Sequence, residues 1–322
     1  MDRRTEILVL TNSIFPMTEE HRHMVEQIAP NATLTVVNKT DATQEQLNKA
    51  EIIFGWPESE QLLAAKNLRW LHLPSAGADS YMDRTLYHCK EIQLTNSSGV
   101  FGLPIAEHVF AMILSYSRNL TEYAWQQKEG IWKGIRRTKD FYGSTMGVIG
   151  LGDIGTEVAK RAKALGARVL GVKRTLGNRP EYVDQLFTSE AIDEVLEQSD
   201  YIVLALPGTK KTTGIITEQS LRRMKPDAFL INIGRGSLVD QDALMKALKE
   251  GWIGGAGIDV TSPEPLPQDS PLWDLKNVII TPHVSGSSPT NDFRRMGIFL
   301  RNLEKYLAGQ RLDNLVDFEE GY

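Results

Sequence analysis

The sequence predicts an α/β protein of two domains, each built on a doubly wound parallel sheet. The chain has 322 residues, more than a single hydrophobic core usually supports. Short apolar runs alternate with helix-like amphipathic stretches along nearly the whole length, which is typical of parallel βα units. The pattern breaks after the first hundred residues and restarts at Thr145. The break favours two sheets over one long one.

The expected strands fall into two sets, separated by this break. The first set is Ile7–Leu10, Thr33–Val37, Glu51–Trp56, Trp70–Pro74 and Ile92–Asn96. The second set is Thr145–Gly150, Arg168–Lys173, Tyr201–Leu206, Ala228–Gly234, Gly255–Val260 and Val278–His283. Six strands is the number in a complete pair of βαβαβ halves, so the second set predicts a full dinucleotide-type sheet.

Two long helices are expected beside the sheets. One runs from Pro104 to about Leu120, with proline at the favoured first helical position. The other runs from Pro289 to Leu307, after the last strand of the second set.

Composition and charge exclude several classes of function. The chain carries 36 basic and 41 acidic residues, for a net charge of -5, and has no long basic block. We therefore do not expect the protein to bind nucleic acid or a membrane, and we expect its partner to be a small molecule. The only cysteine is Cys89, which excludes an internal disulfide and a cysteine-cluster metal site. We expect no metal, no signal peptide or membrane span, and a cytoplasmic location.

A glycine-rich loop follows the first strand of the second set. Gly150, Gly152 and Gly155 have the G-x-G-x-x-G spacing, with Asp153 and Ile154 between the last two, and a helix-like run follows. Such glycines permit a tight turn, the approach of a pyrophosphate, and close packing of helix on strand. This context favours dinucleotide binding over a turn without a ligand.

The next strand ends in a basic pair, Lys173-Arg174. An NAD site usually has an acidic residue here, which binds the ribose hydroxyls. A basic pair would instead attract the 2′-phosphate of NADP, so we expect NADP(H) to be preferred, with NAD(H) possible. The alternative is an ordinary solvated pair, with the ribose held elsewhere.

Polar residues also follow the later strands of the second set: Arg235, Asp259, Glu264 and His283. Taken alone, three of them have an ordinary structural interpretation: Arg235 as a loop salt bridge, Glu264 as a surface acid and His283 as a capped strand-end histidine. Ligands of open parallel sheets, however, bind beyond the carboxyl ends of the strands, where all four fall. Their convergence favours a catalytic site.

Four motifs, in order, resemble those of the D-isomer-specific 2-hydroxyacid dehydrogenases. They are GLGDIG at Gly150, NIGRGSLVDQDAL at Asn232, GIDVTSPEPLP at Gly257 and TPHVSG at Thr281. Ser75-Ala76-Gly77-Ala78-Asp79 resembles the family's substrate-carboxylate loop, and NSSGVFGLPIAEH at Asn96 resembles the entry to its first crossing helix. The resemblance implies a Rossmann cofactor domain at 100–285, inserted into a flavodoxin-like substrate domain at 1–99 and 286–322.

The resemblance also implies a role for each site residue. Arg235 would bind the carboxylate and keto oxygen of a 2-keto acid, and His283 would donate the proton in reduction and accept it in oxidation. Glu264 would hold the imidazole ring and favour its protonated form, while the amides of Ala76 and Gly77 would complete the carboxylate site. Asp259 would orient the nicotinamide carboxamide, and Pro207 and Ile233 would join the glycine loop and the basic pair in binding the cofactor.

FGWP, with Trp56, and GLPIAEH most resemble the glyoxylate and hydroxypyruvate reductase branch. Trp56 is equally well interpreted as a core tryptophan. A 3-phosphoglycerate or bulkier D-2-hydroxyacid dehydrogenase is the nearest alternative, and a dinucleotide-sensing protein with little turnover is another. By analogy with the family we expect a homodimer, whose arm would begin in the stretch Tyr123 to Trp132; a surface helix is the simpler alternative there.

Overall fold

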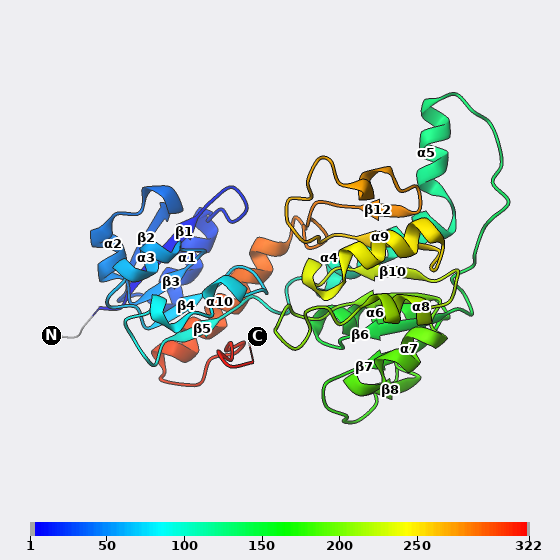
Figure 1. Cartoon of the computed structure of the whole chain (residues 1–322). Helices are drawn as coiled ribbons and strands as arrows, with labels where there is room; N and C mark the ends of the chain where they lie inside the picture. Colours follow the sequence, from blue (N-terminus) through cyan, green and yellow to red (C-terminus); the bar gives the residue numbers. More distant parts are fainter. Residues whose placement is uncertain (1–3, 321–322) are drawn as a thin grey trace. The chain divides into compact units, whose positions relative to one another are not determined.

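The computed structural model describes residues 4–320, which divide into two compact units. The chain up to Val100 and from Ser288 onward forms the first unit, and Phe101–Ser287 forms the second. Within residues 4–320 the first unit has a parallel sheet of five strands and the second a parallel sheet of seven (Figure 1). The predicted α/β class with two parallel sheets is confirmed.

The sheet of the first unit has the order β2-β1-β3-β4-β5, which is the flavodoxin-like order. Its strands are β1 (Glu6–Thr11), β2 (Thr33–Asn38), β3 (Ile52–Phe54), β4 (Trp70–His72) and β5 (Gln93–Thr95). The helices of this unit are α1 (Glu19–Ile28), α2 (Gln44–Lys49), α3 (Ser59–Ala64) and α10 (Asn291–Leu307).

The strands of the first unit are apolar without a break because both faces of the sheet are covered. In β1, Ile7 and Val9 pack in one core cluster, and Leu8 packs in the other. Successive side chains of a strand point to opposite faces, so each face receives alternate residues. On the first face, Phe299 of α10 stacks on Phe54 at 4.4 Å between ring centroids, which joins the end of the chain to its beginning.

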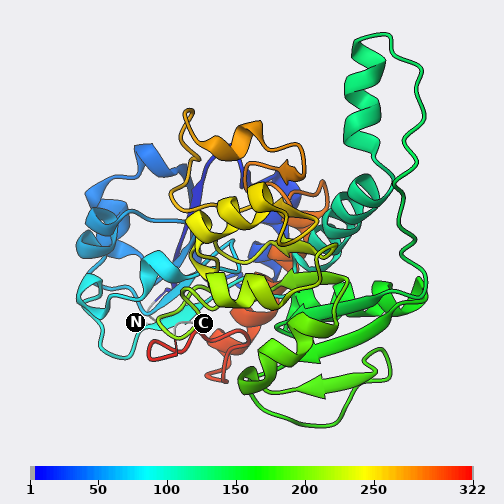
Figure 2. The same ribbon diagram turned by 45° about the vertical axis from the view of Figure 1, so that its right-hand side comes forward.

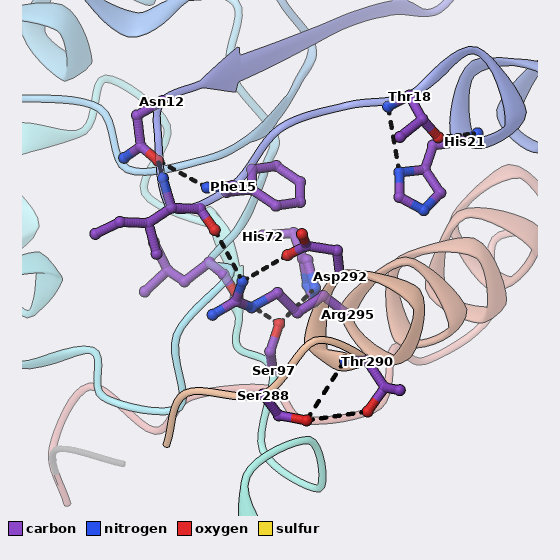
Figure 3. Close-up of polar contacts among 12 residues, drawn as sticks. Asn12, Phe15, Thr18, His21, His72, Ser97, Ser288, Thr290, Asp292 and Arg295 are labelled. Carbon is purple, nitrogen blue, oxygen red and sulfur yellow. Dashed lines mark hydrogen bonds and ion pairs between the residues drawn. The ribbon is translucent and has the colours of Figure 1, made fainter. Parts of the chain in front are cut away.

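Polar contacts join the start of α10 to the loop that follows β1. The Arg295 side chain is buried, and its Nη1 lies 2.8 Å from Asp292 Oδ1 and 3.4 Å from the carbonyl oxygen of Ile14 (Figure 3). In the same loop the Asn12 side chain accepts from the amide of Phe15. These bonds fix the backbone at the carboxyl end of β1.

His72 is completely buried at the end of β4. Its Nδ1 lies 2.7 Å from Thr95 Oγ1 and its Nε2 lies 3.4 Å from Ser97 Oγ, the second of these contacts being visible in Figure 3. Because burial disfavours the charged ring, the pKa of His72 falls to about 3.

Acid is therefore expected to weaken the first unit through His72. Below pH 6.5 the His72 ring is protonated in the unfolded chain but stays neutral in the folded chain. The free energy of unfolding therefore decreases as pH falls from about 6.5 towards 3. Between pH 7 and pH 5 the wild type should lose about 2 kcal/mol more unfolding free energy than His72→Gln, measured by urea unfolding. His23→Gln, at an exposed histidine, is the control and should lose as much as the wild type. Equal losses in His72→Gln and the wild type would contradict the assignment.

The sheet of the second unit has the order β12-β11-β10-β9-β6-β7-β8. Its strands are β6 (Thr145–Ile149), β7 (Arg168–Val172), β8 (Gln185–Phe187), β9 (Tyr201–Leu204), β10 (Phe229–Asn232), β11 (Gly255–Ile258) and β12 (Val278–Ile280). Its helices are α4 (Gly102–Ser117), α5 (Leu120–Lys128), α6 (Asp153–Ala164), α7 (Ile192–Gln198), α8 (Glu218–Arg223) and α9 (Gln241–Glu250).

The count of six strands for this sheet was wrong, because the described sheet has seven. The missed strand is β8, which takes the third position of the usual Rossmann order; β12 extends that order at the far edge. β8 is only three residues long and begins with an exposed glutamine, so it carries too little apolar pattern to be recognised. α4 also begins at Gly102, which makes Pro104 its third residue and not its first. Proline is tolerated there because the first-turn amides have no partner within the helix.

Glycines on β11 bring α4 unusually close to the sheet. A Cβ atom at Gly257 would lie 2.8 Å from Met112 Sδ, and one at Gly255 would lie 2.7 Å from the ring of Tyr116. A side chain at either position would have to displace these α4 side chains. The two glycines therefore leave the space into which Met112 and Tyr116 pack.

α5 extends away from the rest of its unit, and an extended segment returns from it to β6 (Figures 1 and 2). Leu120, Trp125, Ile131 and Trp132 all expose much of their surface, and Trp132 is completely exposed. No helix among residues 4–320 is both long and apolar enough to cross a membrane.

Candidate functional site

The three glycines after β6 differ in what surrounds them. Gly150 has φ +102°, and a Cβ there would lie 2.5 Å from the carbonyl oxygen of Ala205; at Gly155 it would lie 1.8 Å from that of Gly150. At Gly152 a Cβ would meet no atom of the described chain within 4 Å. Turn geometry and packing thus explain the first and third glycines, whereas the second opens onto space that a pyrophosphate at the start of α6 would fill. The loop fits a dinucleotide.

Asp153, the first residue of α6, directs its carboxylate to the start of α4. Its Oδ2 accepts a hydrogen bond of 3.0 Å from the amide of Gly102. A carboxylate is favoured at a helix N-terminus, where unpaired amides carry partial positive charge. This contact gives Asp153 a position that the sequence alone did not explain.

The other predicted cofactor residues lie at the carboxyl ends of neighbouring strands. Lys173 and Arg174 follow β7 and are exposed, and residues 173–180 include no acidic side chain. Pro207 lies beyond β9, and the buried Ile233 follows β10 directly. β6 and β9 are adjacent, and the strand order reverses between them. Ligands of open α/β sheets bind at such a switch point.

Arg235 follows β10 in a loop that is fixed by its own hydrogen bonds. The Asn232 side chain donates to the carbonyl oxygen of Arg235 at 2.9 Å and accepts from the amide of Gly234 at 3.2 Å. A Cβ at Gly208 would lie 2.9 Å from Arg235 Cγ, so the backbone of the loop after β9 lies against the arginine stem. These contacts hold a half-buried guanidinium at the edge of the sheet.

Glu264 and His283 form a hydrogen-bonded pair. His283 Nδ1 lies 2.9 Å from Glu264 Oε2, and the other carboxylate oxygen accepts from the amide of Thr261 at 3.0 Å. An ionised carboxylate only accepts, so Nδ1 carries a proton and Nε2 remains to exchange one. The His283 side chain is 53% exposed, which leaves it accessible to a substrate.

Asp259 is buried and holds the turn that carries His283. The amide of His283 donates to the carbonyl oxygen of Asp259 at 2.8 Å. The next two amides donate to its carboxylate, that of Val284 to Oδ1 at 2.9 Å and that of Ser285 to Oδ2 at 3.0 Å. Thr281 Oγ1 adds a bond of 2.6 Å to Oδ1. Burial by itself would raise the pKa of the Asp259 carboxyl, but the bonds from Ser285, Thr281 and Val284 outweigh it and lower that pKa.

The loops that carry Arg235 and Glu264 touch through their backbones. A Cβ at Gly236 would lie only 2.0 Å from the carbonyl oxygen of Thr261. No other residue fits there without moving one loop. Arg235, Glu264, His283 and Asp259 thus belong to one unit and are fixed to one another through three loops.

The first unit contains the loop with Ala76 and Gly77, after β4. The carbonyl oxygens of residues 75 to 77 in this loop all accept hydrogen bonds. The Ser97 amide donates to the carbonyl oxygen of Ser75, and the Asn96 side chain donates to that of Ala76. The Ser75 hydroxyl donates to the carbonyl oxygen of Gly77. The amides of Ala76 and Gly77 have no acceptor within residues 4–320. Successive backbone amides without an acceptor are a common feature of backbone anion-binding sites.

Trp56, which lies two residues after the end of β3, supports this loop. Its indole Nε1 donates to Ser75 Oγ at 3.0 Å, and Ser75 in turn donates to Gly77. The indole also packs, partly buried, against the core of the first unit, as expected of a core tryptophan.

The fold and this set of residues define a dinucleotide-binding oxidoreductase with a histidine–carboxylate pair. Residues 110–285 match the family model described as "D-isomer specific 2-hydroxyacid dehydrogenase, NAD binding domain". A glyoxylate reductase of Korarchaeum cryptofilum is 37% identical over 81% of this chain and 80% of its own. The chain therefore belongs to the D-isomer-specific 2-hydroxyacid dehydrogenase family, and it carries the family's nicotinamide-dinucleotide-binding domain.

Solved structures agree with this assignment. A family member from Aeromonas salmonicida has a TM-score of 0.86 and 33% identity, covering 98% of this chain and all of the other. A family member from Xanthobacter autotrophicus, in complex with NADPH and MES, has a TM-score of 0.84 and 27% identity, covering 99% of this chain and all of the other.

Sequence reasoning missed the residues that hold the site in place. Thr281, Gly236, Asn96 and Ser75 each fix a loop but carry no distinctive chemistry. A signal was available for Thr281, which stands two residues before His283 in the TPH run.

Proposed function

We propose that this protein reduces small 2-keto acids of the glyoxylate or hydroxypyruvate type to D-2-hydroxy acids, with NADPH as the preferred reductant. The observation that carries the proposal is the Glu264–His283 pair, fixed beside Arg235 at the carboxyl edge of a sheet that also bears the glycine loop. Relatives named glyoxylate reductase support the substrate class.

Arg235, His283 and Glu264 have different roles in this reaction. The Arg235 guanidinium binds the substrate carboxylate and keto oxygen, and its charge stabilises the oxygen as negative charge develops. A reduced nicotinamide dinucleotide, when bound at the glycine loop, would supply the hydride that reduces the keto carbon. His283 donates the Nε2 proton to the oxygen, which completes the hydroxyl group and leaves a neutral imidazole for solvent to reprotonate. Glu264 holds the ring through its hydrogen bond to Nδ1.

The remaining predicted residues complete the proposal. The free amides of Ala76 and Gly77 bind the substrate carboxylate. The pyrophosphate loop is formed by Gly150, Gly152, Asp153, Ile154 and Gly155. Farther along the cofactor lie Pro207, Ile233 and Asp259, and Asp259 orients the nicotinamide carboxamide. We place the enzyme in the cytoplasm, which its single cysteine supports.

A turnover assay tests the function. The protein is supplied with glyoxylate, hydroxypyruvate, 3-phosphohydroxypyruvate and a branched 2-keto acid, each with NADPH and with NADH. Fastest turnover of the two small acids with NADPH supports the proposal. A preference for the larger acids would favour the bulkier dehydrogenases, and cofactor binding without turnover would favour a dinucleotide sensor.

The cofactor preference depends on the basic pair after β7. Arg174→Asp is expected to raise the KM for NADPH by about one to two decades more than the KM for NADH, since a charge-assisted phosphate contact contributes roughly 1.5–3 kcal/mol. Steady-state kinetics with both cofactors measure the change. Arg179→Asp, in the same exposed segment, is the matched control. Equal changes in KM for NADPH and NADH would show that Arg174 does not bind the 2′-phosphate.

We further propose that the protein is a homodimer joined through the arm formed by residues 119–142. Leu120, Trp125, Ile131 and Trp132 are exposed there, and a patch of large apolar residues is expected to be covered by a partner. Light scattering at micromolar concentration should give twice 36.1 kDa, and Trp125→Asp should lower the mass towards the monomer. Trp273→Asp, at an equally exposed tryptophan outside the arm, should leave the dimer intact. A monomeric wild type would contradict this proposal.

A further inference from the structure

The turn that carries His283 places a histidine in the left-handed region of backbone conformation. His283 has φ +53°, which residues other than glycine adopt rarely and only when their surroundings hold them there. The bonds from Asp259 provide that hold. The geometry of the carboxylate therefore determines where the imidazole lies, and it matters what positions the carboxylate.

A chain of hydrogen bonds connects Asp259 to α4. Thr281 Oγ1 lies 2.6 Å from Asp259 Oδ1 and 3.0 Å from His108 Nε2. The carboxylate can only accept, so the single hydroxyl proton of Thr281 goes to Asp259. Towards His108 the hydroxyl must then accept, which means that His108 Nε2 carries a proton. The direction of donation is fixed along the whole chain, from His108 to Thr281 to Asp259.

The packing of α4 on β11 brings His108 to this position. His108, Met112 and Tyr116 are four residues apart and share one face of the helix. Gly255, Gly257 and Asp259 are two residues apart and share one face of the extended chain. Tyr116 packs at Gly255 and Met112 at Gly257, so the next helical step brings His108 towards Asp259. The two repeats match, because four helical residues rise about 6 Å and two strand residues about 6.7 Å.

We propose that His108 and Thr281 are positioning residues for the proton donor: they orient the Asp259 carboxylate and through it the turn of His283. The inference rests on the proposed function, in which His283 donates the proton. In the proposed reaction both residues act through Asp259, and neither has a role at the reacting atoms. The glycines of β11 contribute to the same arrangement, because they leave room for Met112 and Tyr116, which lie on the face of α4 that carries His108.

Paired substitutions test the proposal on the full-length enzyme. Thr281→Val keeps the shape but removes the hydroxyl, and kcat should fall about tenfold or more, with the NADPH dissociation constant changed less than about threefold. Thr281→Ser restores the hydroxyl and should keep at least about half of the wild-type kcat. His108→Leu should lower kcat about three- to tenfold, and His108→Gln, whose amide can donate, should recover most of it.

The double variant gives the decisive comparison. If His108 acts through Thr281, adding His108→Leu to Thr281→Val should lower kcat by less than about twofold, whereas independent roles would multiply the two effects. Multiplied effects would overturn the relay. So would a wild-type kcat in Thr281→Val, or equal losses in Thr281→Val and Thr281→Ser.

Amide hydrogen exchange separates this proposal from the proposed function. The amides of Val284 and Ser285 should exchange several-fold faster in Thr281→Val than in the wild type or Thr281→Ser, whatever substrate the enzyme uses. Unchanged exchange in Thr281→Val would overturn the relay. If no keto acid is reduced and the exchange pattern is as expected, the relay stands and the proposed function fails.

Discussion

Replacing His283 by alanine is expected to lower kcat for keto-acid reduction by ~100-fold or more, because the variant loses its proton donor. The NADPH dissociation constant should stay within about threefold of the wild type, since the glycine loop and basic pair are untouched. Stopped-flow turnover and NADPH fluorescence titration give the two values. The hydrogen bond to Glu264 disappears with the ring, so the variant reports the pair as a whole.

His23→Ala removes an exposed histidine of the first unit and serves as the control. It should leave both kcat and NADPH affinity unchanged. A His283→Ala variant that kept wild-type kcat would show that another group donates the proton. Parallel loss of turnover and NADPH affinity would instead indicate that the turn supports the cofactor site.

Replacing Arg235 by alanine is expected to damage both substrate binding and turnover. Loss of the charge-assisted bonds to the carboxylate should raise the KM for the keto acid by roughly one to two decades. Loss of charge opposite the developing alkoxide should lower kcat by a further ~100-fold or more. Steady-state kinetics with glyoxylate and hydroxypyruvate separate the two effects.

Arg235→Lys sharpens this test. Lysine keeps the charge but lacks the planar fork that binds two oxygens together, so its kinetic constants should fall between those of wild type and alanine variant. Arg223→Ala, at an exposed ion pair on α8, should change neither constant. A rise in KM without any loss of kcat would restrict Arg235 to ground-state binding of the carboxylate.

The fold was largely predictable because buried strands have a strong pattern. β1 and β9 are apolar on both faces, and their expected positions fall within one or two residues of the described ones. β8 was not predicted, because its three residues are too few to show the alternating pattern of a strand. The packing of α4 on β11 was not predicted for a different reason. It depends on the absence of side chains at Gly255 and Gly257, and a glycine in a sequence does not indicate which element packs against it.

The candidate site was predictable in its chemistry but not in its support. Arg235, Glu264 and His283 stand out because they are charged or titratable and follow strands. The sequence also pointed to Asp259, and the family resemblance implied that it orients the nicotinamide carboxamide, but its contacts with the turn of His283 could not be inferred. That its carboxylate accepts from the amides of Val284 and Ser285 depends on a left-handed turn at His283, which no local propensity predicts. The roles of these residues stay predictions until the variants are measured.

The contact between Gly236 and Thr261 limits how this enzyme can diversify. With backbone against backbone, the spacing between the loop that carries Arg235 and the loop that carries Glu264 cannot be adjusted by exchanging side chains. On the proposed roles, every accepted substrate must carry its carboxylate next to its keto group, whatever its third substituent. New specificities would then have to arise where that third substituent lies, while the reaction itself is inherited unchanged.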